Sequence, residues 1–175
     1  SVADTAEVIK PSPGRVNPKC KYYGHCGGCQ LQHAGYEAQL KLKADIVRDA
    51  MVRIGKFPTE LFESLTCEPS PECWGYRNKA AFPVQKFNGK IVTGFYRAGT
   101  HRLELIKNCP VNAEKINEIY GKILDGLRKN SLPLDGYDEQ TGKGKLRHLI
   151  ARTGIKTGES LLSFVINGRL SAKSM

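Results

Sequence analysis

The stretch Ala80-Ala-Phe-Pro-Val-Gln-Lys-Phe-Asn-Gly-Lys-Ile-Val-Thr-Gly-Phe-Tyr-Arg97 decides how the chain folds. Asn88-Gly89 divides it, and both of these residues tolerate the positive φ of a two-residue type I′ turn. The flanking segments 80–87 and 90–97 are rich in apolar and aromatic residues, which is typical of strands. The sequence therefore predicts a β-hairpin. Pro83 predicts an edge position or a bulge for the first strand, because proline cannot donate to a strand ladder.

Three further strands are expected after the hairpin, at residues 102–107, 145–153 and 160–167. The segment 131–144 reads as a loop, and the turn 154–158 joins the last two strands. Helical periodicity occupies residues 31–54, and it returns after Asn112, a suitable N-cap, as far as about residue 129. The pattern predicts an α+β fold, with an antiparallel sheet of about five strands and two main helices.

Each predicted helix carries one apolar face, which is expected to pack against the rest of the protein. Gly55 and Pro58 supply the end of the first helix. Its apolar face consists of Tyr36, Leu40, Val47, Met51 and Ile54, and that of the second helix consists of Ile116, Tyr120, Ile123 and Leu127.

Composition restricts the class of protein. The chain has 175 residues, 40% of them hydrophobic and 25% charged, which is ordinary for a water-soluble domain with its own core. No apolar run approaches the ~20 residues of a membrane helix, so no membrane partner is expected. The first seven residues have no signal-peptide pattern, which favours a cytoplasmic protein. A formal net charge of +10 attracts polyanions, and nucleic acid is the commonest of these inside a cell.

A cysteine-rich segment, residues 19–30, precedes the first helix. Cys20, Cys26 and Cys29 follow the spacing C-x5-C-x2-C, and Cys109 comes after the third predicted strand. This spacing is one residue from the run that holds a two-iron cluster in plant-type ferredoxins. Glycines between the cysteines let the backbone wrap tightly, so that several thiolates converge. We therefore expect a four-cysteine site made of Cys20, Cys26, Cys29 and Cys109.

The residues alone leave the nature of that site open. An iron–sulfur cluster and a four-cysteine zinc site use the same ligands. A disulfide framework would consume all six cysteines, but disulfides belong mainly to secreted chains. Cys67 and Cys73 are left over, and they are expected to be packing residues rather than nucleophiles.

Basic and aromatic side chains recur along the predicted sheet. Arginine clamps phosphate through its planar fork, and aromatic rings offer stacking faces for unpaired bases. The recurrence on one small sheet favours an RNA surface. The candidate RNA-binding residues are Trp74, Tyr76, Arg77, Lys79, Arg97, His101, Arg147, His148 and Arg152.

Together these motifs resemble the iron–sulfur RNA (uracil-5-)-methyltransferases. The resemblance runs from about Ser12 to Asn167 and is closest to enzymes that act on 23S ribosomal RNA. It rests on Pro11-Ser-Pro-Gly-Arg15-Val, Cys20-x5-Cys26-Gly-Gly-Cys29-Gln-Leu-Gln-His33-x2-Tyr36-x2-Gln39-Leu40-x2-Lys43, Arg53-Ile-Gly55, Tyr76-Arg77-Asn78-Lys79, Gly94-Phe-Tyr-Arg97, Cys109-Pro110, Leu146-Arg147-His148 and Arg152.

The family implies a [4Fe-4S] cluster on the four cysteines already named, in the middle part of a three-part enzyme. Residues 1–18 would be an extended lead-in from an N-terminal barrel, residues 19–30 with Cys109 the iron–sulfur site, and residues 31–170 a central α/β RNA-binding domain. In the family, a cysteine of a C-terminal S-adenosylmethionine (SAM) domain attacks C6 of a uracil, and C5 takes the methyl group. Neither that cysteine nor the SAM site has a counterpart here, so no catalytic residue is expected and the fragment alone is expected to be inactive. RNA is the expected partner of a monomer.

Two other readings use the same residues. A non-enzymatic RNA-binding module would hold zinc on the four cysteines. A ferredoxin-like electron carrier would hold the cluster, but it fits the net charge of +10 poorly.

Overall fold

The computed structural model describes residues 7–129, 135–139 and 141–169. Residues 1–6 of the predicted lead-in, and residues 130–134 and 140 of the predicted loop, lie outside the described residues. Internal contacts divide the chain into two units, which are described separately. The first, the helical unit, comprises Ser1–Lys19 and Gln30–Pro71. The second, the sheet unit, comprises Cys20–Cys29 and Glu72–Met175.

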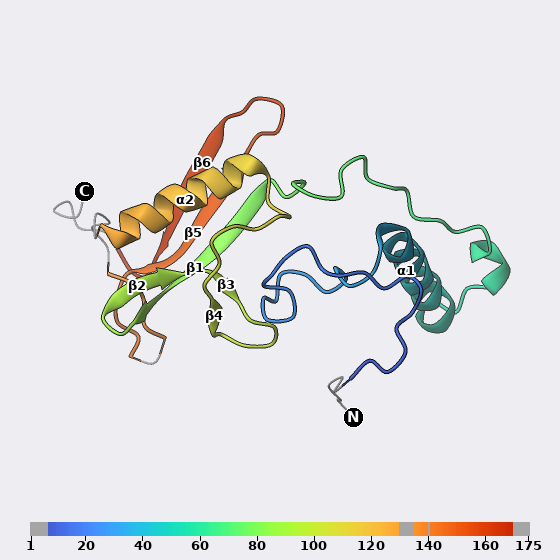
Figure 1. The fold of residues 1–175 in the computed structure, drawn as a ribbon. Coiled ribbons are helices and arrows are strands. Elements are labelled where there is room, and N and C mark those ends of the chain that lie inside the picture. The colour runs from blue at the N-terminus through green and yellow to red at the C-terminus, as the bar shows by residue number, and fades with distance from the viewer. Residues whose placement is uncertain (1–6, 130–134, 140, 170–175) are drawn as a thin grey trace. The chain divides into compact units, whose positions relative to one another are not determined.

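The sheet unit is built on four antiparallel strands in the order β2-β1-β5-β6. Helix α2 (Glu114–Arg128) packs against β5 and β2 and covers one face of this sheet (Figure 1). Two short strands, β3 (Phe95–Tyr96) and β4 (Leu103–Glu104), pair separately. The long strands are β1 (Lys79–Phe87), β2 (Lys90–Thr93), β5 (Leu146–Thr153) and β6 (Ser160–Ile166).

The predicted hairpin is present between β1 and β2. Phe87 pairs with Lys90, which leaves the two residues between them to form the turn. Asn88 has φ 50° and Gly89 has φ 74°, the left-handed conformation that a type I′ turn requires. The α+β class with two helices and an antiparallel sheet is therefore confirmed.

The prediction of one sheet with about five strands was wrong, because the sheet unit contains a four-stranded and a two-stranded sheet. The strand predicted at 90–97 stops at Thr93 and resumes at Phe95 with a different partner. Between them, Gly94 lies so close to Glu104 that an added Cβ would overlap the Glu104 carbonyl oxygen. This close backbone approach redirects the chain, and it is a tertiary contact that strand periodicity does not reveal.

Pro83 lies in an interior strand, so its predicted edge position was wrong. β1 pairs with β5 through residues 79–83 and with β2 from Val84 onward. Pro83 is therefore the last residue of β1 that pairs with β5, and the pairing with β2 begins at the next residue. Its missing N–H thus lies at the end of a strand ladder and not in its middle. Its carbonyl oxygen accepts a hydrogen bond from Thr93 Oγ1 at 2.8 Å.

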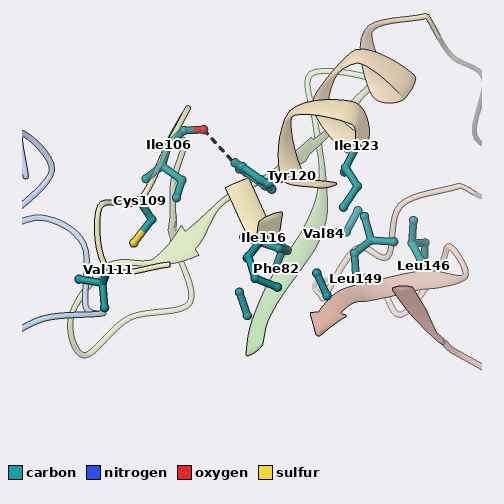
Figure 2. Close-up of a cluster of buried hydrophobic side chains, with 12 residues drawn as sticks. Phe82, Val84, Ile106, Cys109, Val111, Ile116, Tyr120, Ile123, Leu146 and Leu149 are labelled. Carbon is teal, nitrogen blue, oxygen red and sulfur yellow. Dashed lines mark hydrogen bonds between the residues drawn. The ribbon is translucent and has the colours of Figure 1, made fainter. Parts of the chain in front are cut away.

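The core lies between the four-stranded sheet and α2 (Figure 2). Phe82 and Tyr120 are fully buried and stack with ring centroids 4.2 Å apart. The Tyr120 hydroxyl donates to the carbonyl oxygens of Thr93 at 3.1 Å and Ile106 at 3.3 Å. Burial raises the pKa of Tyr120 well above its usual range, which keeps this hydroxyl a donor. The predicted apolar face of α2 is confirmed, because Ile116, Tyr120 and Ile123 are buried and Leu127 packs against the core.

The N-cap of α2 is one residue later than predicted. Ala113 occupies that position, and the helix begins at Glu114. Asn112 is instead buried, and its backbone N–H donates to the Cys109 carbonyl oxygen at 3.1 Å. No side chain among the described residues caps the helix at this end.

The helical unit contains α1 (Tyr36–Asp49), followed by a π-helical turn at Ala50–Ile54. The predicted helix began at residue 31, but residues 33–35 pair with the lead-in instead. Val16 N–H donates to the His33 carbonyl oxygen and Gly35 N–H to that of Gly14, both at 2.8 Å.

The apolar face predicted for the first helix does not form a buried core. Ala44 is the buried residue of α1, whereas Val47 is 50% exposed and Ile54 83% exposed. A single helix has no second layer of secondary structure to cover such a face. Neither helix in the described part of the chain has the length and apolar content needed to cross a lipid bilayer.

Candidate metal centre and nucleic-acid interface

The cysteine loop, residues 20–29, is a succession of tight turns within the sheet unit. Tyr23 N–H donates to the Cys20 carbonyl oxygen at 3.0 Å, and Cys26 N–H donates to that of Tyr22 at 2.8 Å. Gly24 adopts φ 89°, a conformation that favours glycine. These bonds, between residues three and four apart in sequence, fold the loop on itself.

The loop is attached to the small sheet. Gly27 N–H donates to the Tyr96 carbonyl oxygen at 2.9 Å, and Cys26 forms a β-bridge with Arg97. A Cβ on Gly27 would come within 3.1 Å of the Ala98 backbone, so glycine permits this close approach. β3 therefore determines where the loop lies within the sheet unit.

Cys109 lies directly before α2, and the helix holds it in place. Asn117, in the first turn of α2, accepts from Cys109 N–H through Oδ1 at 3.1 Å and donates to the Cys109 carbonyl oxygen through Nδ2 at 3.0 Å. The adjoining segment meets the cysteine loop, because Lys107 N–H donates to the Tyr22 hydroxyl at 3.1 Å. Cys109 is buried in the core, and Cys29 packs against the same core.

The four predicted ligand cysteines share one neighbourhood. Burial raises the pKa of the Cys26 thiol, and the thiols of Cys109, Cys29 and Cys20 raise it further, while the Gly28 N–H lowers it. Because these electrostatic effects fall off with distance, the thiols of Cys20, Cys29 and Cys109 each lie within interaction range of Cys26. The structure thus brings Cys109 to the loop, although 80 residues separate it from Cys29. Cys67 and Cys73 are not among the thiols that raise the pKa of Cys26.

Two backbone N–H groups lie near the thiol of Cys109, the buried cysteine of the four. Burial raises the pKa of the Cys109 thiol, whereas the N–H groups of Val111 and Asn112 and the Arg77 guanidinium lower it. N–H donors and a cation near sulfur stabilise a thiolate, the form that binds metals. The donor set therefore suits an anionic metal–thiolate centre. The described residues contain no group of three or more His, Cys, Asp or Glu side chains arranged to hold a metal ion.

Arg77 links the two parts of this candidate centre. Its N–H donates to the Val111 carbonyl oxygen at 3.0 Å, and its carbonyl oxygen accepts from Ala113 N–H at 2.9 Å. Its guanidinium reaches the Gly28 carbonyl oxygen at 3.4 Å. The side chain predicted to bind RNA therefore lies between the cysteine loop and the Cys109 segment.

Three other side chains predicted to bind RNA interact with residues of the protein itself. The Arg97 guanidinium pairs with Glu104 at 2.9 Å, and His101 Nδ1 lies 3.0 Å from a Glu139 carboxylate oxygen. The Arg147 guanidinium stacks 4.5 Å from the centre of the Tyr137 ring. Side chains that the sequence predicted to bind a polyanion are therefore engaged in contacts within the protein.

The remaining aromatic and histidine candidates differ in exposure. Trp74 packs against the core, whereas Tyr76 is 54% exposed. His148 is half-buried, and burial together with the neighbouring Arg147 charge lowers its pKa, against an opposing effect of Glu139. The imidazole is therefore neutral near pH 7 and carries no charge toward RNA.

Lys79 and Arg152 are the two predicted cations that remain available. They pair directly across β1 and β5, and both are exposed. Neither has an ion-pair partner among the described residues. Together they line a cavity of about 660 Å³ at one end of the sheet.

Asn117 is a residue that sequence reasoning missed. Its one sequence signal is its place in the first turn of a helix that follows a candidate ligand, since first-turn side chains can reach the segment before the helix. That signal alone does not identify a bond to residue 109, which depends on how the chain enters α2.

Asn117→Ala is expected to destabilise the sheet unit by about 1–3 kcal/mol, because it leaves the Cys109 N–H without a partner and removes one of the two hydrogen bonds to the Cys109 carbonyl oxygen. The change should appear as a lower urea midpoint and as faster hydrogen exchange at the Cys109 amide. Lys115→Ala, at an exposed position on the same helix, serves as the control. Equal exchange at Cys109 in both variants would contradict this role for Asn117.

Comparisons with known proteins show similarity to RNA methyltransferases. No family model matches the chain. It is 38% identical over 166 residues to an uncharacterized RNA methyltransferase of Thermosynechococcus vestitus, which covers 95% of this chain and 36% of the relative. Uncharacterized RNA methyltransferases of a Synechocystis species and of Clostridium tetani are each 38% identical as well, over 94% of this chain and 35% of the relative.

A solved structure resembles the chain in fold and sequence. The crystal structure of Pyrococcus abyssi tRNA (uracil-54, C5)-methyltransferase in complex with S-adenosyl-L-homocysteine aligns with a TM-score of 0.64 and 25% sequence identity. The alignment covers 96% of this chain and 36% of that enzyme. Over almost its whole length, the chain is therefore similar to proteins named RNA methyltransferases. It spans about one third of the length of these relatives.

Proposed function

We propose that this chain is the cluster-bearing, RNA-binding part of a SAM-dependent RNA (uracil-5-)-methyltransferase. The similarity to RNA methyltransferases supports the general activity. The likeness to a uracil C5 enzyme that binds S-adenosyl-L-homocysteine supports the reaction type and the methyl donor. The catalytic nucleophile and the SAM site are proposed to lie in other parts of the enzyme, so that this chain alone transfers no methyl group.

The observation that carries the proposal is that the thiols of Cys20, Cys29 and Cys109 all raise the pKa of the Cys26 thiol. These four thiols interact electrostatically, although they come from a loop and from the segment before α2. A [4Fe-4S] cluster on them would cross-link the two segments, which is the chemistry that it would supply here. With four cysteine ligands it has no open coordination position, so its role is structural.

The protein's own residues prepare this centre. Asn117 holds the Cys109 backbone, and Arg77 spans the interval between Gly28 and Val111. The Arg77 charge would offset part of the negative charge of a thiolate-bound cluster. Arg77 thus has a positioning role in the centre in addition to any contact with RNA.

The proposed substrate is RNA, and 23S ribosomal RNA is the specific proposal on the resemblance of the sequence motifs to those of the ribosomal enzymes. The enzyme must take its target uridine out of the surrounding fold, which costs roughly a few kcal/mol. A basic sheet with an exposed Tyr76 would help to supply that energy by holding the unpaired strand.

Metal analysis of anaerobically purified protein tests this proposal. About four irons and about four acid-labile sulfides per chain, with a brown chromophore, are expected for a [4Fe-4S] cluster. One zinc without sulfide would overturn the cluster and favour a zinc-containing RNA-binding module. A cluster with a reversible redox wave and no RNA affinity would favour an electron carrier instead. If the protein contains neither metal nor sulfide, the four-cysteine site itself is overturned.

A further inference from the structure

One end of the four-stranded sheet contains a cavity of about 660 Å³, where β1 begins and the β5–β6 turn reverses the chain. This volume lies within the range of small-ligand sites. It is separate from the cysteine loop, none of whose residues lines it. The lining residues are Asn78, Lys79, Arg152, Thr153, Gly154, Thr157, Glu159, Ser160 and Leu161.

Two positive charges face each other in this cavity. Lys79 and Arg152 are direct cross-strand partners, and such partners project from the same face of a sheet. Like charges directly opposite each other destabilise a sheet. Among the described residues no carboxylate forms an ion pair with either side chain, so the Glu159 carboxylate at the border of the cavity offsets the repulsion only in part. An anion placed between them would relieve it.

The β5–β6 turn, which forms part of the lining of the cavity, has a defined shape. Thr153 Oγ1 donates to the Glu159 carbonyl oxygen at 3.2 Å, and Glu159 N–H donates to Thr157 Oγ1 at 3.3 Å. A Cβ on Gly154 would overlap Thr157 Oγ1, so glycine lets the turn close tightly. The backbone thus holds this turn in place, and the Glu159 side chain borders the same cavity.

The cavity also has an apolar border. Leu161 pairs with Arg152 from the other side, on β6, and is 57% exposed. Lys79, Arg152 and Leu161 therefore form one row across three strands. A row of two cations and an exposed leucine suits a charged phosphate joined to a less polar sugar and base.

We infer that this cavity binds one nucleotide of a single-stranded RNA segment, with one backbone phosphate held between Lys79 and Arg152. The inference rests on the proposed RNA-binding function and deepens it by naming the contact site. The ribose would lie toward Glu159, whose carboxylate can accept a hydrogen bond from a ribose hydroxyl. Arg97, His101 and Arg147, which have partners within the protein, would contribute less to RNA affinity than this pair.

The dependence of RNA affinity on salt measures this contact directly. For single strands, the slope of log K against log salt changes by about 0.7 for each phosphate neutralised. The double variant Lys79→Gln with Arg152→Gln should therefore reduce the slope by about 0.7, because both cations hold the same phosphate. At fixed moderate salt it should weaken binding of an unstructured uridine-rich RNA about tenfold, as expected for lost charged hydrogen bonds.

The control removes two positive charges elsewhere on the sheet unit. Lys90→Gln with Lys122→Gln changes the net charge equally, and both positions are exposed and outside the cavity. This control should retain nearly the parental slope. Urea unfolding of both double variants verifies that they fold, and the alanine versions provide a second pair.

Several outcomes would overturn the inference. A slope reduction of about 1.4 would mean two separate phosphates, and equal losses in the cavity and control variants would mean a diffuse charge effect. Competition by uridine monophosphate at the affinity of the RNA segment would mean a free-nucleotide site. If the parent protein binds RNA but the cavity variants bind it equally well, this inference alone fails. If the parent binds no RNA, the proposed function fails with it.

Discussion

Cys109→Ser is expected to abolish retention of an iron–sulfur cluster, with iron and sulfide falling from about four each per chain to near zero. The substitution removes the thiolate that the α2 segment contributes, while serine nearly preserves the side-chain size at this buried position. The bonds of Asn117 to the Cys109 backbone do not involve the thiol, so the local fold should persist. Iron, sulfide and visible absorbance of anaerobic protein provide the measurement.

Cys67→Ser and Cys73→Ser are the matched controls, because neither thiol belongs to the set that interacts with Cys26. Both variants should keep the full metal content. A Cys109→Ser protein that retained four irons would contradict the ligand assignment. Loss of metal from a control variant would instead extend the centre beyond the four proposed cysteines.

Phe82→Ala is expected to lower the free energy of unfolding of the sheet unit by about 3–5 kcal/mol. The Phe82 ring is fully buried and lies 4.2 Å from the Tyr120 ring centroid and 5.3 Å from that of Phe95. Truncation therefore leaves a cavity between β1, β3 and α2, and removes two aromatic contacts. Urea unfolding followed by tyrosine and tryptophan fluorescence measures the loss.

Phe87→Ala on the same strand is the control. Phe87 is 64% exposed beside the hairpin turn, and we expect its truncation to change stability by less than about 0.5 kcal/mol. Equal losses for both substitutions would show that burial against α2 is not the main source of stability in β1.

Local sequence signals were most reliable where the structure is itself local. The Asn88-Gly89 turn depends on the φ preferences of two adjacent residues, and it forms as predicted. The apolar face of α2 depends on helical periodicity within a single element, and it is buried as expected. The first helix shows where this reasoning stops. Its periodicity was correct as far as it predicted a helix, but periodicity does not say whether another element covers the face.

The candidate site shows the same division. The charges of Arg97, His101 and Arg147 are plain in the sequence, but their partners Glu104, Glu139 and Tyr137 are brought to them by the fold. Which of these side chains remain available for RNA could not be predicted, because each contact depends on the three-dimensional position of a second residue. Strand register places Lys79 and Arg152 directly opposite each other, which makes them the strongest candidates for a phosphate contact.

The sequence by itself determined the hairpin, the α+β class, the apolar face of α2, and the residue types of the proposed four-cysteine centre. These follow from backbone preferences, periodicity and thiol chemistry, which act over a few residues. Only the tertiary structure decided the division into two sheets, the interior place of Pro83, the convergence of Cys109 with the loop, and the hold of Asn117 on it. Those features arise from contacts between segments up to 85 residues apart, and no local preference encodes which segments will meet.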